Sequence, residues 1–331
     1  MNRPTRFQHA VFPGGNQINI TSSPIPSPVD GEVILRVRRT ALCGSDNRLW
    51  RDGAEQIPGH EIFGVVEQPG HSRDGERACV YIPVYCGHCD ACSRGLTQSC
   101  ETQSVLIGWN RNGGFGEYVQ VPEQCLLPVP DTITDRLAPL LLDTIGTSAH
   151  AVRTVTRWLE NIDNKRILIT GAGPIGMGVL IALQDLGCNE VRVFDPIATR
   201  TTFAGELGAR QTDNDSTRRF DIIFECSGAH AARDAAITQV APGGAIVIIG
   251  ENSAPWEIKE GPVFRRKDFA LLRSFYFPVC EHQDNIALLL RQKESYEKIA
   301  DVDLSLSELA DGYQRFVAGD TMKPLLTIPG A

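Results

Sequence analysis

Apolar and polar positions follow two different patterns along the chain, and the change lies close to Leu137. Before it, short apolar runs such as 31–39 and 61–69 alternate with polar positions, and glycine and proline separate the runs. Alternation with a period of two, interrupted by turn residues, is typical of short β-strands. The pattern therefore predicts an all-β region over residues 7–130.

After Leu137 a helical stretch over Ala149–Leu159 leads into alternating strands and helices. Helices are predicted over Gly176–Leu186 and Ala198–Leu207. Strands that are buried on both faces are predicted for four apolar, β-branched runs: RILIT (166–170), EVRVFD (190–195), DIIFECSG (221–228) and AIVIIG (245–250). This alternation predicts an α/β fold with a doubly wound parallel sheet.

The chain of 331 residues is long enough for two domains. After about residue 272 the strand runs lose their regularity, and the rest, with a helix around 285–292 and a strand KPLLTI, is too short to bury a core of its own. We therefore expect residues 1–145 to form a β-rich domain, 146–273 the doubly wound domain, and 274–331 to return to the first.

The composition is that of a globular protein, with 42% hydrophobic and 22% charged residues. Acidic residues exceed basic ones by 40 to 32, and the formal net charge is −8. Such a surface repels a phosphate backbone unless basic residues cluster, and no long basic run occurs, so we expect no nucleic acid partner. Without an apolar signal region or a stretch of about 18 apolar residues, we expect a cytoplasmic protein with no membrane partner.

Four of the ten cysteines are crowded into residues 86–100. In a long chain without a signal peptide this crowding favours a metal site over disulfides. Tetrahedral zinc with four sulfur ligands has no place left for substrate, so this spacing predicts a structural zinc held by Cys86, Cys89, Cys92 and Cys100. An iron–sulfur cluster is the alternative occupant, although the spacing differs from the ferredoxin patterns.

A glycine-rich turn follows the predicted strand 166–170 and precedes a predicted helix, as a dinucleotide-binding motif requires. The first glycine permits the tight turn, the second lets the backbone approach a pyrophosphate, and the third allows the helix to pack on the strand. The free N–H groups of the helix then face the anion. The expected cofactor-binding residues of this turn are Gly171, Gly173, Pro174, Ile175 and Gly176.

Asp195 ends the next predicted strand, about 20 residues after the last glycine, where an acid binds the adenosine ribose. A carboxylate at that place accepts hydrogen bonds from two ribose hydroxyls and repels a 2′-phosphate, so we expect NAD rather than NADP. Arg200 either covers the same ribose or is a solvated helix residue.

Two short motifs precede the cysteine-rich segment, Cys43-Gly-Ser45-Asp46 and Gly59-His60-Glu61. In the order CGSD, GHE, the four cysteines, GGFGEY and GAGPIG, the motifs run through the whole chain. This set resembles the zinc-dependent medium-chain alcohol and polyol dehydrogenases. The resemblance implies a GroES-like catalytic domain, a Rossmann coenzyme domain and two zinc ions per chain.

The resemblance also implies the ligands of a catalytic zinc. Cys43 and His60 match two of them, and Asp143, within LLLDTIGTSAHAV, stands where polyol and threonine dehydrogenases have a carboxylate. Three protein ligands leave a fourth place for water or an alcohol. Glu61 is the rival third ligand, because in relatives this residue can move onto the zinc.

In such enzymes the zinc favours loss of the alcohol proton, and hydride passes to the nicotinamide. Ser45 matches the residue that relays the proton. Arg48 stands where many members have a histidine that accepts it, and an arginine cannot act as a base. Arg48 is therefore expected to bind an anionic group or to be a surface residue, while Asp46 is expected to accept a structural hydrogen bond.

Because the resemblance ties a carboxylate ligand to polyol and threonine dehydrogenases, it implies that the substrate is a secondary alcohol of a polyol or sugar-like compound, interconverted with its ketone. An L-threonine 3-dehydrogenase or a butanediol-type dehydrogenase is the alternative enzyme, and a non-catalytic zinc- and nucleotide-binding relative is the alternative from another class. By resemblance we expect a homodimer or homotetramer.

Overall fold

The computed structural model describes residues 5–159, 161–213, 215, 217–258 and 261–328. The chain divides into two compact units, which are described separately. The first extends to Leu142 and also contains Phe277–His282 and the segment from Ala300 onward, and the second contains Asp143–Tyr276 and Gln283–Ile299. No helix of the described residues is long and apolar enough to cross a membrane.

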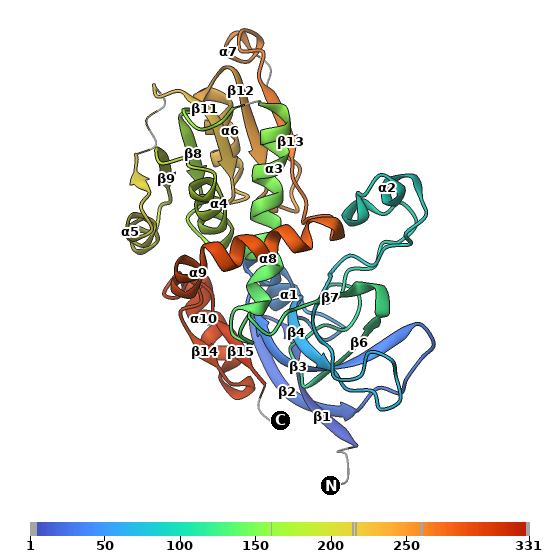
Figure 1. Ribbon diagram of the computed structural model, residues 1–331. Coiled ribbons are helices and arrows are strands. Elements are labelled where there is room, and N and C mark those ends of the chain that lie inside the picture. The colour runs from blue at the N-terminus through green and yellow to red at the C-terminus, as the bar shows by residue number, and fades with distance from the viewer. Residues whose placement is uncertain (1–4, 160, 214, 216, 259–260, 329–331) are drawn as a thin grey trace. The chain divides into compact units, whose positions relative to one another are not determined.

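The first unit is built on a largely antiparallel sheet with the strand order β14-β15-β3-β4-β5-β7, and β6 also pairs with β3 (Figure 1). In β3 the apolar residues are buried, whereas its arginines are partly exposed. The strands are β1 (Arg6–Gly14) and β2 (Gln17–Pro24), which form a separate hairpin, and β3 (Glu32–Ala41), β4 (Glu61–Val66), β5 (Arg77–Val80), β6 (Tyr118–Pro122), β7 (Leu126–Pro128), β14 (Asp303–Leu304) and β15 (Leu325–Thr327).

Helices of the first unit are short except for the last. They are η1 (Gly44–Asp46), α1 (Asn47–Asp52), α2 (Asp90–Ser93), η2 (Thr97–Ser99), η3 (Glu123–Cys125), η4 (Ala138–Leu141), η6 (Val279–Glu281), η7 (Leu306–Glu308) and α10 (Leu309–Ala318).

The second unit has a parallel sheet with the order β10-β9-β8-β11-β12-β13, as expected for a doubly wound domain. The four predicted strands are present, and β10 and β13 extend the sheet at its edges. The strands are β8 (Ile167–Thr170), β9 (Val191–Phe194), β10 (Arg210–Gln211), β11 (Phe220–Glu225), β12 (Val240–Ile248) and β13 (Ala270–Arg273).

The helices of this unit are η5 (Asp143–Thr147), α3 (Ser148–Trp158), α4 (Pro174–Asp185), α5 (Ala198–Glu206), α6 (His230–Gln239), α7 (Pro262–Arg265), α8 (His282–Arg291) and α9 (Lys293–Ile299). Helices α4, α5, α6 and α7 lie between successive strands of the parallel sheet, η5 and α3 precede it, and α8 and α9 follow it. The helices expected over 149–159, 176–186, 198–207 and 285–292 are all present. The α/β fold class, with a β-rich unit and a doubly wound unit, is thereby confirmed.

Residues 274–331 were expected to join the first domain as a whole, but the structure groups Gln283–Ile299 with the second unit. Polar contacts join this segment to helices of the second unit. Arg291 of α8 forms an ion pair with Asp185 at the end of α4, at 2.7 Å, and Asn285 accepts a hydrogen bond from Arg153 of α3, at 2.9 Å.

Candidate metal centres and cofactor site

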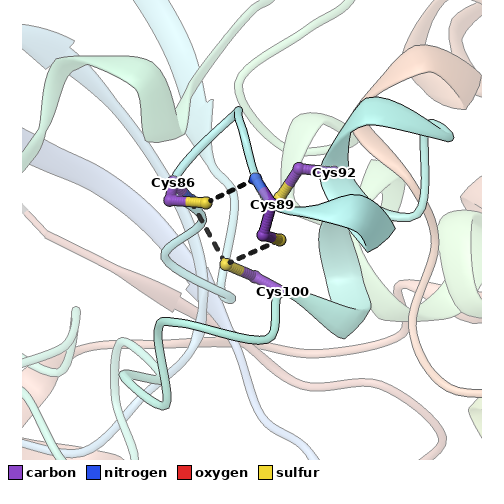
Figure 2. Close-up of side chains that lie close together, drawn as sticks. All are labelled: Cys86, Cys89, Cys92 and Cys100. Atoms are coloured by element: carbon purple, nitrogen blue, oxygen red, sulfur yellow. Dashed lines mark hydrogen bonds between the residues drawn. The ribbon is translucent and has the colours of Figure 1, made fainter.

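Four cysteine sulfurs converge in the segment 86–100 (Figure 2). Their Sγ atoms all lie within 4.8 Å of one another. The backbone turns so that the N–H of Cys89 donates to the sulfur of Cys86, at 3.2 Å, and the N–H of Cys86 donates to the sulfur of Cys100, at 3.3 Å. None of the ten cysteines, all of which lie in the described ranges, forms a disulfide.

The electrostatics of this cluster suit a cation. Hydrogen bonds from the Thr102 hydroxyl and from the backbone N–H groups of His88 and Cys89 lower the pKa of the Cys86 thiol to about 5. Burial raises the pKa of the Cys92 thiol to about 12, a cost that a bound divalent ion would offset. Four sulfur donors at this spacing are the ligand set of a closed, structural zinc site.

A second cluster of potential metal ligands contains three buried residues of the first unit, Cys43, His60 and Glu61. Antiparallel pairing of β3 with β4 sets Ala41 opposite Glu61, which brings the segment after β3 to the start of β4. The first segment of the first unit ends at Leu142, and Asp143 is the next residue of the chain. One ligand atom from each of Cys43, His60, Glu61 and Asp143 lies within 4.8 Å of the others.

His60 is oriented by a buried carboxylate. Its Nδ1 lies 3.0 Å from Oδ1 of Asp46, and the two side chains are 2% and 0% exposed. Asp46 thus has the acceptor role expected of it. A histidine whose Nδ1 is held in this way presents Nε2 to a metal, and such partners typically contribute 10- to 100-fold, by order of magnitude, to metal affinity or activity.

Cys43 is held from two sides. The hydroxyl of Ser45, in the 3-10 helix η1, donates to the Cys43 sulfur at 3.2 Å. The phenol of Tyr313, in α10, donates to the Cys43 carbonyl oxygen at 3.3 Å. Ser45 therefore lies beside the expected ligand, as the motif implied, whereas the part played by Tyr313 had no signal in the sequence.

Arg48 lies at the surface near this cluster. Its guanidinium carbon is 4.9 Å from the ring centroid of Trp109, whose ring in turn lies 5.5 Å from the ring of His60. Arg48 is exposed. It is thus connected to His60 through an aromatic side chain rather than by a hydrogen bond in the described part of the chain.

Glu61 forms an ion pair with Lys323, in which the lysine Nζ contacts the carboxylate Oε1. The two side chains are 0% and 1% exposed. Sequence reasoning did not find Lys323, which lies in the predicted terminal strand KPLLTI and stands just before β15. A lysine is rarely buried without a partner. The position of Lys323 at the start of a predicted apolar strand was therefore a signal that it could be buried and paired with an acidic residue.

Asp143 begins η5, a π-helical turn that precedes α3. The hydroxyl of Thr147 donates to Oδ1 of Asp143 at 3.4 Å. Single π-turns are rare in proteins, and those that occur are often found at functional sites. A thiolate, an imidazole and carboxylates are all zinc ligands, so the donor set of this second cluster also fits zinc.

The glycine-rich turn joins β8 to α4 in the second unit. Gly171 has φ 94°, a left-handed conformation that favours glycine. A Cβ on Gly176 would lie 1.9 Å from the carbonyl oxygen of Gly171, so this position too requires glycine, whereas a Cβ on Gly173 would meet open space. Pro174 is at the N-terminus of α4, and the carbonyl oxygen of Ile175 accepts a hydrogen bond from Ser148 at 2.9 Å.

Asp195 follows β9 and braces this turn. Its carboxylate accepts hydrogen bonds from the backbone N–H groups of Ala172 and Ile197, both at 2.8 Å. One hydrogen bond on each oxygen leaves a lone pair for a further donor. Arg200 is half-buried in α5, and its Nε has no hydrogen-bond partner among the described residues.

A buried glutamate that the sequence analysis did not single out holds the loop after β11, at the same edge of the sheet. Glu225 ends β11 and accepts hydrogen bonds at Oε1 from the N–H groups of Ser227 and Gly228, both at 2.8 Å. Its Oε2 pairs with Arg233 at 3.2 Å. Since β8 lies between β9 and β11, these loops flank the point where the strand order reverses, which is where dinucleotides bind in such folds.

Comparison with known proteins gives two family matches. Residues 29–131 match the alcohol dehydrogenase GroES-like domain, and residues 174–290 match the family described as zinc-binding dehydrogenase. The chain is 33% identical to the starvation-sensing protein RspB of Escherichia coli (strain K12) over 264 residues, which are 73% of this chain and 76% of that protein. It is 31% identical to an L-threonine 3-dehydrogenase of Mesorhizobium japonicum over 261 residues, 71% of this chain and 74% of that enzyme.

Solved structures agree with this placement. The crystal structure of RspB from E. coli CFT073 complexed with the cofactor NADH superposes with a TM-score of 0.86 at 27% identity and covers 98% of this chain and 100% of its own. Alcohol dehydrogenase TADH from Thermus sp. ATN1 reaches a TM-score of 0.88 over 97% of this chain and 100% of its own, and at 23% identity that likeness shows the fold alone.

The resemblance expected from the ordered motifs is therefore confirmed by the two family matches and by the curated relatives, which extend over most of the chain. The chain belongs to the zinc-dependent medium-chain dehydrogenase family of oxidoreductases.

Proposed function

We propose that this protein is a zinc-dependent, NAD(H)-using dehydrogenase that interconverts a secondary alcohol and a ketone, on a polyol or sugar-like substrate. The observation that carries the proposal is the cluster of the buried residues Cys43, His60 and Glu61 with the half-buried Asp143, whose ligand atoms lie within 4.8 Å of one another. A thiolate, an imidazole and one carboxylate would hold the ion and leave a fourth place for substrate.

In this proposal Cys43, His60 and Asp143 hold the catalytic zinc, and Cys86, Cys89, Cys92 and Cys100 hold a structural zinc. When bound, the catalytic ion supplies Lewis acidity, which makes loss of the alcohol proton easier. Asp46, which lies 3.0 Å from Nδ1 of His60, would orient the imidazole and leave Nε2 available as the ligand atom.

Ser45 would move the proton. Its hydroxyl lies beside the expected ligand Cys43 and donates to that sulfur. Rotation about χ1 would let the same oxygen accept the proton of a substrate alcohol and donate its own proton onward. The exposed Arg48, on the far side of Trp109, would attract an anionic group of substrate or cofactor.

The second unit would bind the dinucleotide. Gly171, Gly173 and Gly176 shape the turn, and the free N–H groups at the start of α4 would face the pyrophosphate. Asp195 would accept hydrogen bonds from the adenosine ribose and would repel a 2′-phosphate, which favours NAD over NADP. A dinucleotide held by these residues would supply the hydride acceptor for oxidation of the alcohol.

The substrate class is tested by following NADH absorbance while purified protein and NAD are mixed with polyols, inositols, L-threonine, 2,3-butanediol and simple alcohols. Turnover of a polyol or inositol above the other compounds is expected. Preference for L-threonine would favour the alternative enzyme, to which the 31% identity with an L-threonine 3-dehydrogenase points. No turnover, in protein shown to carry two zinc ions per chain, would contradict the proposed class and favour a non-catalytic relative.

A further inference from the structure

The parallel sheet of the second unit has the strand order of a fold built from two mononucleotide-binding halves. Strands β8, β9 and β10 form the first half, to which the glycine turn and Asp195 belong. Strands β11, β12 and β13 form the second half, and residues 226–229 and 249–252 follow β11 and β12 at the same edge of the sheet. In the proposed function these two loops would face the nicotinamide half of the dinucleotide, so the contacts that fix them bear on hydride transfer.

The two loops of the second half are packed backbone against backbone. A Cβ on Gly250 would lie 2.1 Å from the nitrogen of Gly228, and a Cβ on Gly228 would lie 2.1 Å from the carbonyl oxygen of Glu251. The loop after β11 also touches the glycine turn, since a Cβ on Gly171 would lie 2.8 Å from the nitrogen of Ser227. At contacts this close, a shift of one loop displaces the other.

Arg233 of α6 connects the two loops. Its Nε donates to Oε2 of Glu225 at 3.2 Å, and its Nη2 donates to the carbonyl oxygen of Gly250 at 2.8 Å. The other carboxylate oxygen of Glu225, Oε1, accepts hydrogen bonds from the N–H groups of Ser227 and Gly228. One guanidinium group is thus bound to the loop after β12 directly and to the loop after β11 through a single carboxylate.

The pair of Arg233 and Glu225 is withdrawn from solvent, with side chains that are 9% and 0% exposed. The ring centroid of Trp256, from the loop after β12, lies 5.8 Å from the guanidinium carbon of Arg233. Arg273 of β13 supports the same loop through the carbonyl oxygen of Ile249, at 2.8 Å. Removal of one partner from a buried ion pair leaves an uncompensated charge, so loss of Arg233 would disturb the carboxylate that holds the loop after β11.

We propose that Arg233 is a positioning residue, which acts through Glu225 to set these two loops for the nicotinamide half of the dinucleotide. The adenosine half depends instead on the glycine turn and on Asp195. This inference rests on the proposed function, because it assumes that the second unit binds NAD. Displaced loops would weaken the second half of the site and leave the first half intact.

The test compares two ligands of the full-length protein: NADH, which fills both halves of the site, and ADP, which has no nicotinamide. Arg233→Met is expected to weaken NADH binding about 10-fold. The affinity for ADP, measured by calorimetry, should stay within about 2-fold. The fluorescence emission of bound NADH, which reports the surroundings of the nicotinamide, should move toward that of free NADH, and kcat should fall about 100-fold.

A double variant keeps the test decisive if Arg233→Met does not fold. Arg233→Met with Glu225→Gln leaves no unpaired buried charge, and the amide oxygen still accepts the N–H groups of the loop after β11. Because it lacks the contact with Gly250, it is expected to show the same selective loss of NADH affinity. The matched control is Arg166→Met, which removes an arginine paired with Asp221 at 2.8 Å at the amino ends of β8 and β11, with side chains 59% and 27% exposed, and should change neither affinity.

Equal losses of affinity for NADH and ADP would overturn the inference, because the pair would then support the whole domain rather than one half of the site. NADH binding by both variants as tight as that of the unmodified protein would overturn it as well. A selective loss of NADH affinity, in a protein that oxidises none of the tested alcohols, would support the inference and contradict the proposed reaction. If the unmodified protein binds neither NADH nor ADP, the proposed cofactor and this inference fail together.

Discussion

The two potential metal centres differ in how the chain builds them. The four cysteines come from one stretch, 86–100, and their sulfurs are held mainly by the backbone of that stretch. The second cluster joins Cys43, His60 and Asp143 from separate parts of the chain and is oriented by Asp46, Tyr313 and Lys323.

The contrast indicates two functions. Four identical soft ligands close the coordination sphere, whereas a thiolate, an imidazole and one carboxylate leave a place open. The half-exposed loop cluster therefore suits stabilisation of a fold, and the buried mixed cluster suits chemistry. Each prediction below would sharpen this division or break it.

The largest effect is expected for Cys43→Ala. Loss of a ligand should release the catalytic ion and remove Lewis-acid stabilisation of several kcal/mol, so kcat/KM should fall by about 10³-fold or more. Zinc content should decrease from two ions per chain to one, while the circular dichroism spectrum stays the same. Retention of both ions, or of activity, would show that the mixed cluster is not the catalytic site.

Cys89→Ser should lower the stability of the protein and leave its activity nearly unchanged, the reverse of Cys43→Ala. Loss of the loop zinc should cost about 3 kcal/mol of unfolding free energy, which for a unit of this size lowers Tm by about 6–12 °C, measured by calorimetry. The kcat of the folded enzyme should stay within about 2-fold, since no substrate place is lost. Cys280→Ser, at an exposed cysteine outside both clusters, is the control. A loss of activity as large as that of Cys43→Ala would abolish the distinction between the centres.

Asp46→Asn should have an intermediate effect. The amide no longer offers a charged acceptor to Nδ1 of His60, so zinc affinity, measured by competition with a chelator, should fall about 10-fold. Asp52→Asn, at an exposed carboxylate at the end of α1, is the control. Equal affinities in the two variants would mean that the 3.0 Å contact does not tune the metal site.

Arg48→Gln should have the smallest effect. Its observed contact is a cation–π interaction with Trp109, worth about 0.5–1 kcal/mol at an exposed site. Steady-state kinetics should show a change of about 2- to 5-fold in KM, with kcat preserved. A fall of more than about 100-fold in kcat, a scale associated with proton transfer, would assign Arg48 a direct part in the reaction.

The same contrast decides which features could be predicted from the sequence: those formed within one short segment could be predicted, and those that join distant segments could not. The cysteine loop and the glycine turn each have their chemistry within one short segment. The spacing of the cysteines indicated the first, and the glycine spacing between a predicted strand and a predicted helix indicated the second. The strands of the doubly wound sheet were found because burial on both faces demands long apolar runs.

Features that depend on strand register were missed. Lys323 contacts Glu61 only because β15, β3 and β4 are neighbours, and Tyr313 reaches Cys43 from a helix far along the chain. The π-turn of η5 does not follow the helical period that the sequence shows. The helix pattern around 285–292 was found, but an amphipathic face does not say which core it covers.

The central claim is tested most directly by removing zinc with a chelator in steps, while zinc per chain and dehydrogenase activity are measured on the same samples. The account predicts two ions per chain, with activity lost in proportion to the first ion released and the second retained after activity is gone. Activity that persists after one ion has left, or protein that holds a single ion when fully active, would contradict it.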